Sequence, residues 1–516
     1  MTDIDVIIVG AGPSGMMLAS ELCSAGVRPL VLERQPQPRD TPKASGIGGR
    51  ILDLLRYRGL LERFEIASGD PNPAPRFPFG GMHVDFTQMM DPPMRAVAIP
   101  QIDTERLLAE HALELGADIR RGHEVVGVSQ DDAAVTVDVR GPDGPYQMTA
   151  RYLVGCDGGR SRIREMAGIA FPGTTYPEVN RVGHVTVPDS MTVHDNGDIE
   201  VPELGRIPAG FNRTDRGVFA FAAGADGLFL STIENEPTEY DDDEPMTLTE
   251  LGESVRHVLG GDLPWGEPIR LSRFTFKDRQ AERYRDGRIL LAGDAAHLLP
   301  ATGVALNLGM LDSVNLAWKL AADIQGWAPA GLLDTYHDER HATGARALLQ
   351  TRAQVALRRG HDAAADALRA VLQELLVDEQ SLRRLGNLIA GNDTRYSIPN
   401  PNQHALTGTF APDLALRTDQ GATSVAELAH AARPILLDLD DRKELREIAR
   451  DWQHRIDIQT AETDDRPADA LLIRPDAHIA WAATVDESAD TAAQGLREAL
   501  TYWFGAPAET TVPTTS

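Results

Sequence analysis

A glycine-rich segment near the start of the chain has the residue types and the spacing that bind a pyrophosphate. It spans Gly10–Gly15, between an apolar run of residues 4–9 that is typical of a buried strand and a predicted helix of residues 14–25. Glycine permits a tight turn at Gly10, close approach of phosphate to the backbone at Gly12 and close helix packing at Gly15. The amino end of the helix attracts the anion. The segment therefore predicts a dinucleotide-binding turn.

A carboxylate at a suitable distance supports this prediction. Glu33 ends a second predicted strand, 18 residues after Gly15, where an acidic side chain accepts the ribose hydroxyls of a dinucleotide. A glutamate rather than an arginine at this place favours FAD or NAD over NADP. The alternative is a tight turn with a purely structural role, which leaves Glu33 unexplained.

A second acidic turn favours FAD over NAD. Residues 288–292 form a predicted buried strand that ends in Gly293 and Asp294, and a helix is predicted from about Leu306. Two such turns suit a long ligand, with its phosphates at Gly10–Gly15, a polyol beside Asp294 and a ring at the later helix. The chain is therefore expected to hold FAD.

The order of the elements predicts an α/β fold. A strand–helix–strand unit opens the chain, and a buried strand of residues 152–156 leads into Asp157. We expect a Rossmann-like FAD-binding domain over residues 1–178 and 273–345, a β-sheet substrate-binding domain over 76–100 and 179–272, a helical segment over 346–395, a linker over 396–405 and a compact α/β domain over 406–516.

Composition excludes several other classes of protein. The 516 residues carry a formal net charge of −27, which disfavours nucleic acid and anionic membrane surfaces as partners. No apolar stretch reaches the roughly 18 residues of a membrane span, and the acidic start is not a secretory signal, so a cytoplasmic protein is expected. Cys23 and Cys156 are too few for a disulfide framework or a thiolate metal site. The acidic run of residues 240–244 is expected to be a solvated loop or helix start, so no metal is predicted.

The chain resembles the class A flavoprotein aromatic monooxygenases of the para-hydroxybenzoate hydroxylase type, and within them the polyketide and rifampicin hydroxylases of actinomycetes. The resemblance covers almost the whole chain. It rests on Gly10–Gly15 with Glu33, on Asp157-Gly158, and on Gly293-Asp294 followed by Asn307 and residues 312–316. It implies a monooxygenase that uses FAD, NADPH or NADH, and O₂.

The resemblance also implies a reaction. The enzyme would hydroxylate a bulky aromatic, polyketide-like substrate through a flavin C4a-hydroperoxide, in antibiotic biosynthesis or modification. Two alternatives stay open: Baeyer–Villiger oxygenation by the same intermediate, and a flavin protein that binds an aromatic ligand without oxygenating it. The chain has no second dinucleotide fingerprint, which agrees with transient binding of the nicotinamide. Whether copies of the chain form a homo-oligomer stays open as well.

Individual site residues follow from the same resemblance. Lys43 replaces an arginine of the family beside the flavin, Asp294 would bind the ribityl hydroxyls, and the helix that starts near Asn307 would face the pyrimidine edge of the flavin. No side chain is assigned proton transfer, and His297 is expected to make a structural hydrogen bond. The full set of expected cofactor contacts is Gly10, Gly12, Pro13, Ser14, Gly15, Glu33, Arg34, Lys43, Gln101, Val125, Asp157, Gly293, Asp294, Pro300, Gly303, Leu306 and Asn307.

Candidate substrate contacts come from a strand pattern rich in aromatic residues and from the later β region. They are Met82, His83, Phe86 and Phe221. For His83 the competing interpretation is an exposed strand of alternating polarity. For the Met and Phe side chains, as for Phe219 and Phe229, ordinary packing in the core is the preferred interpretation.

Two regions depart from the family pattern. The loop of residues 300–307 is one residue shorter than in relatives and has Val304 and Ala305 where they have glycines, so it is expected to take a different path because valine resists positive φ. The segment from Leu406 resembles an appended thioredoxin-like domain. With no Cys-x-x-Cys in the chain it cannot be a dithiol oxidoreductase, and we expect it to be dispensable for flavin chemistry.

Overall fold

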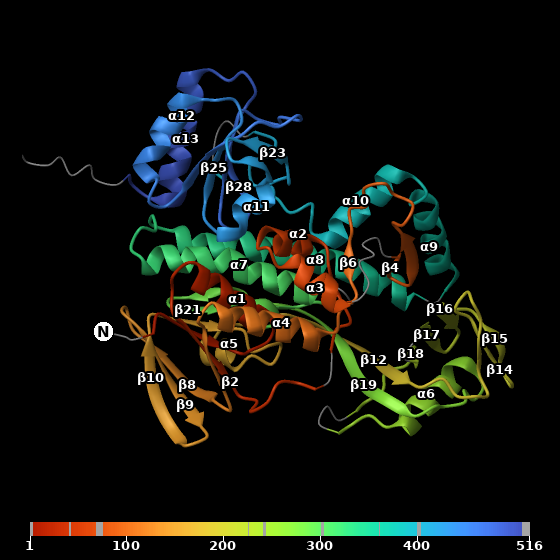
Figure 1. Ribbon diagram of the computed structural model, residues 1–516. Coiled ribbons are helices and arrows are strands. Elements are labelled where there is room, and N and C mark those ends of the chain that lie inside the picture. Colours follow the sequence, from red (N-terminus) through yellow and green to blue (C-terminus); the bar gives the residue numbers. More distant parts are fainter. Residues whose placement is uncertain are drawn as a thin grey trace, which may run out of the picture.

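Three parts stand out in the structure, a computed structural model that describes residues 4–40, 43–68, 76–224, 227–240, 244–300, 304–360, 362–399 and 404–507. Figure 1 shows a central parallel sheet with its helices, a second sheet with α6 (Leu248–Leu259) at the lower right, and the C-terminal domain, in blue, above α7 (Ala305–Ile324). The mixed α/β architecture expected from the sequence is confirmed.

The central sheet has six strands in the order β20-β21-β11-β1-β2-β7. All its pairs are parallel except β20 with β21. Its middle strands are buried on both faces, as their unbroken apolar runs predict for a parallel sheet covered by helices. Its elements are β1 (Val6–Val9), α1 (Pro13–Ser24), β2 (Pro29–Glu33), α4 (Gln101–Glu114), β7 (Asp118–Arg121), β11 (Tyr152–Gly155), α5 (Arg162–Met166), β20 (Arg285–Asp286) and β21 (Ile289–Leu291).

Smaller elements surround this sheet. The antiparallel strands β8 to β10 form a separate three-stranded sheet between β7 and β11, and β3 pairs with β6 beside α2. Their bounds are β3 (Ile47–Gly48), α2 (Arg50–Tyr57), α3 (Leu61–Ser68), β6 (Ala96–Val97), β8 (Glu124–Gln130), β9 (Val135–Gly141) and β10 (Gly144–Ala150). Both cysteines are free thiols, and burial raises the pKa of Cys23 to about 11.

The second large sheet is antiparallel, in the order β16-β17-β18-β12-β19-β22. Helix α6 packs on one of its faces, and Thr247 caps the amino end of that helix. Within the acidic run, residues 241–243 lie outside the described residues. The strands are β12 (Gly173–Val185), β16 (Gly210–Thr214), β17 (Gly217–Gly224), β18 (Gly227–Glu234), β19 (Pro268–Gln280) and β22 (His297–Leu298); β13 (Thr192–Val193), β14 (Ile199–Val201) and β15 (Gly205–Ile207) form a small neighbouring sheet.

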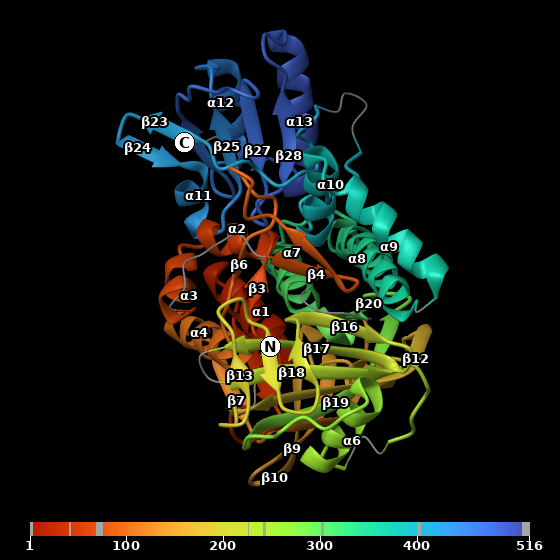
Figure 2. The ribbon, with the colours of Figure 1, turned by 90° about the vertical axis from the view of Figure 1, so that its right-hand side faces the viewer.

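A helical layer joins the two sheets. Helix α8 (Thr335–Arg359) runs without a break across the domain boundary that we predicted at residues 345 and 346. It is followed by α9 (Ala363–Leu375) and α10 (Glu379–Ala390). Figure 2 shows α8, α9 and α10 along one side of the molecule, with β4 beside them. The hairpin of β4 (Arg76–Phe79) and β5 (Met82–Asp85) shares an apolar cluster with α8 and α10.

The C-terminal domain contains a strand–helix–strand unit followed by a hairpin and a helix, around a sheet in the order β26-β25-β27-β28. Its elements are β23 (Ala415–Thr418), β24 (Gly421–Ser424), α11 (Val425–Leu428), β25 (Ile435–Asp438), α12 (Lys443–Ala449), β26 (Asp457–Thr460), β27 (Ala470–Ile473), β28 (Ile479–Ala483) and α13 (Ala489–Phe504). In the predicted linker, Tyr396 and Ile398 are buried, so this stretch packs against its neighbours.

Buried charged side chains join the C-terminal domain to α7 and α8. Arg474, just after β27, donates to both carboxylate oxygens of Glu339 at 2.6 and 2.8 Å, and also to Asp476. Lys319 of α7 donates to the same Glu339 at 2.7 Å. The guanidinium of Arg474 lies over the Trp503 ring, 4.4 Å from its centre. The domain therefore completes a buried cluster, which argues against our expectation that it can be dispensed with.

Within the described ranges, no helix is long and apolar enough to cross a membrane. The same ranges hold no group of three or more His, Cys, Asp or Glu side chains arranged to bind a metal.

Candidate functional site

The three sequence motifs meet at one edge of the central sheet. The strands β1, β2, β11 and β21 are parallel neighbours, so their carboxyl ends lie side by side. The Gly10 amide donates to Leu32 at the end of β2 at 2.9 Å, and the Cys156 amide donates to Val9 at the end of β1 at 2.8 Å. The glycine turn, Glu33, Asp157 and the turn at Gly293 therefore surround one edge.

The three glycines of the first turn differ in the space that a side chain would find at each position. Gly10 has φ +107°, and a Cβ there would lie 2.5 Å from the carbonyl oxygen of Cys156. A Cβ on Gly15 would lie 2.0 Å from the carbonyl oxygen of Gly10. A Cβ on Gly12 would meet nothing within 4 Å. The space in front of Gly12 is open at the amino end of α1, where helix amides lack intrahelical partners and attract an anion.

Backbone amides on either side fix the orientation of the Glu33 side chain. One carboxylate oxygen accepts from the Ala11 amide at 2.9 Å and the other from the Gln35 amide at 2.8 Å. Two backbone donors hold the half-buried carboxylate beside the glycine turn, where its remaining lone pairs can accept ribose hydroxyls. The next residue, Arg34, is exposed.

The Asp157 side chain caps a helix and keeps one oxygen unused. Its Oδ2 accepts from the amides of Arg162 and Ile163 at 2.7 and 3.2 Å, at the start of α5. Its Oδ1 is buried and has no hydrogen-bond partner among the described residues. Burial raises the pKa of Asp157, while a hydrogen bond with Ser161 opposes that shift. A buried acceptor without a donor fits a hydroxyl group of a bound ligand.

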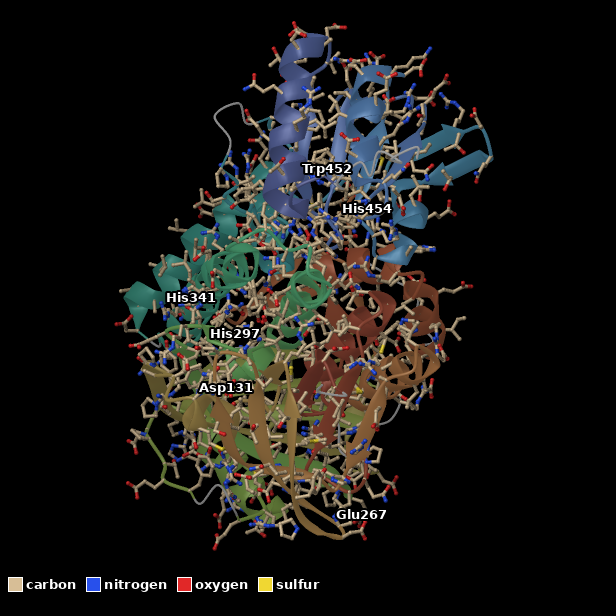
Figure 3. The ribbon with its side chains drawn as sticks, turned by 90° about the vertical axis from the view of Figure 1, so that its left-hand side faces the viewer. Asp131, Glu267, His297, His341, Trp452 and His454 are labelled. Carbon is tan, nitrogen blue, oxygen red and sulfur yellow. The ribbon has the colours of Figure 1, made fainter. Side chains whose placement is uncertain are left out.

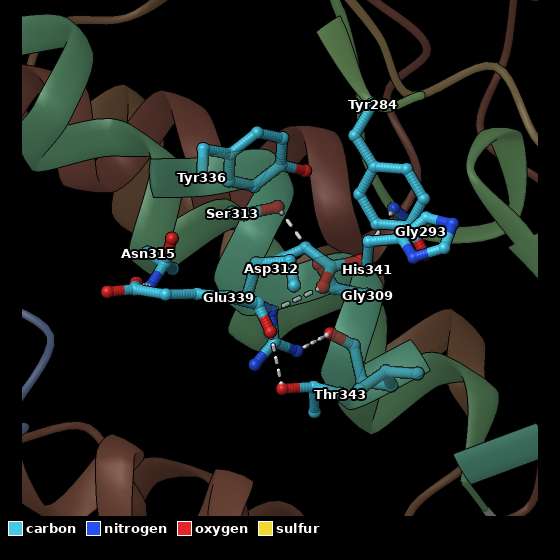
Figure 4. A network of polar contacts seen from close by, with 12 residues as sticks. Tyr284, Gly293, Gly309, Asp312, Ser313, Asn315, Tyr336, Glu339, His341 and Thr343 are labelled. Atoms are coloured by element: carbon cyan, nitrogen blue, oxygen red, sulfur yellow. Dashed lines mark hydrogen bonds and ion pairs between the residues drawn. The ribbon is translucent and has the colours of Figure 1, made fainter. Parts of the chain in front are cut away.

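The second acidic turn is held from behind by Asp312 of α7. Asp312 accepts from the Gly293 amide at 3.1 Å, from His297 at 2.7 Å and from Arg340 of α8 at 2.7 Å. Burial alone would raise the pKa of Asp312, but Arg340 and His297 lower it. Figure 4 shows Asp312 close to Gly293 and Gly309.

His297 makes the structural hydrogen bond that the sequence predicted. Its side chain is 0% exposed, and its Nε2 pairs with Asp312. Figure 3 shows it in the body of the molecule, below the C-terminal domain that carries Trp452. Behind the same turn, Arg164 donates to the carbonyls of Ala295 and Gly159, and so ties the second and third motifs together. No sequence motif points to Arg164, because an arginine inside a short helix resembles a surface residue.

Asp294 presents its carboxylate to open space. Its side chain is exposed, although burial by the surrounding protein raises its pKa and His297 and then Lys43 lower it. Burial, followed by the charge of Arg39, lowers the pKa of Lys43, which Asp294 opposes. An acid that protein surrounds but does not cover is placed to accept hydroxyls from a ligand in the cleft.

Other predicted cofactor contacts have protein partners. Gln101 accepts from the Ala44 amide and donates to Glu105, and it thereby fixes the segment that follows Lys43. Asn307 accepts from the Gly48 amide at 3.3 Å. Val125 and Pro300 are buried and Leu306 is half-buried, while Gly303 lies outside the described residues.

Ser14 differs from its predicted role in one respect. Its hydroxyl lies 2.5 Å from where a Cβ on Gly293 or on Gly309 would be, so it fills the contact between α1 and α7. Its carbonyl accepts from Ser313 at 2.8 Å. The Ser14 side chain therefore packs between the motifs, and only its backbone amide, in the first turn of α1, suits a phosphate.

The described end of the shortened loop avoids positive φ. Val304 has φ −119° and ψ −35°, and α7 begins at Ala305, one residue before the predicted start. The valine therefore does not take up the left-handed backbone conformation that glycine allows. Residues 301–303 lie outside the described residues.

Three predicted substrate contacts belong to the core. Met82 and Phe86 are buried in the cluster that joins the β4–β5 hairpin to α8 and α10. Phe221 is buried on the α6 face of the second sheet. These assignments are corrected, because each side chain fills the contact between two elements. The side chain of His83 lies outside the described residues.

The other face of this sheet holds one aromatic side chain, Phe229, that we had assigned to the core. Phe229 is 47% exposed and stacks on His184 with ring centres 3.8 Å apart, while Phe219 is buried as expected. Strand alternation places Phe229 and Phe219 on opposite faces.

Comparisons with known proteins agree with this geometry. Residues 3–351 match the family described as FAD binding domain, and residues 404–507 match the family described as aromatic-ring hydroxylase, C-terminal. A 12-dehydrotetracycline 5-monooxygenase/anhydrotetracycline 6-monooxygenase of Streptomyces rimosus is 41% identical, over 98% of this chain and 99% of that one. A dialkyldecalin synthase of Streptomyces rugosporus is 39% identical, over 97% and 98% of the two chains.

Solved structures give the same result. An anhydrotetracycline hydroxylase from Streptomyces rimosus superposes with a TM-score of 0.86 at 40% identity, covering 98% of this chain and 99% of that one. The three motifs at one sheet edge, the C-terminal domain and these similarities lead to one conclusion. The chain belongs to the family of FAD-dependent aromatic-ring monooxygenases.

Proposed function

We propose that this FAD-dependent monooxygenase hydroxylates an anionic or phenolic aromatic polyketide, with NADPH or NADH as the electron donor. The observation that carries the proposal is the meeting of the three motifs at one sheet edge, beside a second sheet that carries the exposed Phe229 on the face opposite α6. The enzyme named for anhydrotetracycline supports the substrate class, because this chain is similar to it over almost its full length.

The residues present fit FAD. The open space at Gly12 and the amino end of α1 would hold the pyrophosphate, and the unpartnered Oδ1 of Asp157 would accept a hydroxyl. Asp294 would accept ribityl hydroxyls. When bound, FAD supplies the redox chemistry that reduces and activates O₂. The protein's part is to orient the ring and the substrate and to exclude water from them.

Asp294→Ala should weaken FAD binding about tenfold or more, because hydrogen bonds to a charged group contribute more than neutral ones. The dissociation constant is measured by titrating flavin-free protein with FAD and following the flavin fluorescence. The matched control is Glu267→Ala, which removes an exposed carboxylate just before β19. Equal FAD affinity in the Asp294 variant and the wild type would contradict the assignment.

Oxygenation itself is tested with anhydrotetracycline as the probe. We expect the FAD-loaded enzyme to oxidise NADPH or NADH faster when the probe is present, and the product to gain one oxygen atom by mass spectrometry. A product that alkali opens, as it opens a lactone, would favour Baeyer–Villiger insertion over hydroxylation. Probe-independent oxidation with no gain in mass would contradict hydroxylation of this class.

A second function, binding and shaping a ligand without oxygenating it, has one specific observation in its favour. The dialkyldecalin synthase is nearly as similar to this chain as the monooxygenase is, and its name denotes a ring-forming reaction. In that case the probe would bind and perturb the flavin spectrum while its mass stayed unchanged.

A further inference from the structure

A cavity of about 330 Å³ lies between the second sheet and the carboxyl end of α8. The sheet contributes Asn180, Val218, Ile233 and Phe276, and the helix contributes Val355 and Arg358. The register pairs Asn180 with Ile233 and Ile233 with Val218, so these three side chains form one row across the sheet. By strand alternation, this row is on the face opposite Phe219, which packs on α6.

The cavity is linked to the flavin turn by a single strand. Gln280 at the end of β19 pairs with His297 of β22, just after Asp294. Phe276 lies four residues earlier on β19, roughly 13 Å away at about 3.3 Å per residue. Asp278 lies between them on the same face of β19 and is paired with Arg352 of α8, so an ion pair separates the cavity from the turn.

Arg358 is a cation without a counter-ion in this cavity. Its guanidinium makes no hydrogen bond or ion pair with any described residue, and its Nε is buried. The guanidinium carbon lies 5.2 Å from the ring centre of Phe276 and 5.9 Å from that of Phe211. Burial, followed by the charge of Arg213, lowers its pKa to about 10, so the side chain stays charged at neutral pH. The side chain is half-buried, and aromatic rings rather than a carboxylate lie beside its guanidinium in the described structure.

The acidic side chains around the cavity already have partners. Glu178 pairs with Arg359 at 2.6 Å, and Glu234 pairs with Arg181 at 3.0 Å. Asp362 accepts from the Ala365 amide and caps α9. None of these acids is paired with Arg358 in the described structure.

The neighbouring arginines have structural roles that Arg358 lacks. Arg213 donates to the carbonyl of Arg358 at 2.8 Å, and Arg369 donates to the carbonyls of Leu357 and Gly360 at 2.7 and 2.9 Å. Both satisfy carbonyl groups at the carboxyl end of α8, where a helix lacks intrahelical donors and favours cations. Among these arginines, the Arg358 guanidinium is the one that contacts aromatic rings and has no hydrogen-bond acceptor in the described structure.

We propose that Arg358 binds an anionic oxygen carried by the aromatic ligand, a phenolate, enolate or carboxylate attached to a planar ring system. Phe276, which lines the cavity, would contact the rings while the guanidinium, a planar fork of donors, pairs with the oxyanion. The formal net charge of −27 repels anions in general, so recognition of one requires a local cation of this kind. The identification of this ligand as the substrate rests on the proposed function; the anion preference of the cavity does not.

The test compares two probes of the same shape on the FAD-loaded enzyme, anthracene-2-carboxylate and its neutral carboxamide. We expect the wild type to bind the carboxylate about tenfold more tightly, as for a hydrogen bond to a charged group. Arg358→Gln should reduce this preference to less than twofold while it still binds the carboxamide, and Arg358→Lys should keep part of it. The matched control is Arg346→Gln, which removes another arginine of α8, paired with Asp393. Calorimetric titration gives all the affinities.

Thermal melting gives an independent result. Ligand-free Arg358→Gln should melt no lower than the wild type, because the change removes an unpaired charge. Equal binding of both probes by the wild type, no binding of either, or a full carboxylate preference in Arg358→Gln would overturn the proposal. If anhydrotetracycline is not oxygenated but the carboxylate preference is present and is lost with Arg358, the proposed function fails and this inference stands.

Discussion

Glu339→Gln should lower the free energy of unfolding by about 3–5 kcal/mol, the usual cost of breaking a buried ion pair on one side. Glu339 receives two hydrogen bonds from Arg474 and one from Lys319, and the Lys319 side chain is 0% exposed. The amide has almost the same shape but leaves two buried cations with one carboxylate fewer. Urea unfolding, followed by tryptophan fluorescence, measures the loss. The matched control is Glu374→Gln on the exposed side of α9.

The pH dependence of stability provides a second measurement on the same pair of proteins. Burial alone would raise the pKa of Glu339, but Arg474 and Lys319 lower it to about 2, below the roughly 4.3 of an unfolded chain. The stabilisation is therefore complete above the unfolded value and is lost as the pH falls from about 4.3 towards 2. The wild type should lose more stability over this window than Glu339→Gln. Equal slopes, or a variant within 1 kcal/mol of the wild type at neutral pH, would show that the pair contributes little.

Gly15→Ala and Gly12→Ala should have opposite effects on the flavin-free protein. A methyl group on Gly15 would overlap the carbonyl oxygen of Gly10, which is backbone and cannot move aside, so we expect a loss of about 3 kcal/mol or more. A methyl group on Gly12 meets no protein atom within 4 Å, so the flavin-free protein should keep its stability or gain slightly.

FAD titration separates these two glycines further. Because the open space at Gly12 is where the pyrophosphate is expected, Gly12→Ala should lower FAD affinity at least tenfold in a protein that is otherwise stable. Gly15→Ala should lose FAD only together with its fold. A stable Gly15→Ala, or normal FAD binding by Gly12→Ala, would contradict the division of roles between the two positions.

Local patterns were enough to predict the central sheet and its motifs. Strands β1, β11 and β21 are unbroken apolar runs that end at a glycine or an acid, and parallel pairing then places Gly10, Asp157 and Gly293 at a common edge. Because parallel strands have their carboxyl ends on the same side of a sheet, strand direction alone predicts that these three residues lie near one another. Asp312 and His297 also lay within the recognised motif, although only the structure shows that Asp312 accepts from the Gly293 amide and pairs with His297.

Contacts between distant parts of the chain could not be predicted in this way. Glu339 and Arg474 are 135 residues apart, and in sequence each resembles a solvated charge on an amphipathic element. The cavity beside Arg358 combines four strands and a helix, so its existence depends on the register of antiparallel pairs. Tyr396 has the sequence context of a linker, yet it is buried because its hydroxyl accepts from Arg340 and its ring stacks on His478.

The position of Tyr396 limits how this architecture can be recombined. A line of contacts runs from His478 of the C-terminal domain through Tyr396 and Arg340 to Asp312, which holds the turn that carries Asp294. A chimera that takes its C-terminal domain from a relative replaces His478 and its neighbours but keeps Asp312 of α7 and Arg340 of α8. The two sides of these contacts then come from different proteins. Helices α7 and α8 and the C-terminal domain should therefore be exchanged together. An exchange at the boundary between α8 and the C-terminal domain would separate residues that depend on one another.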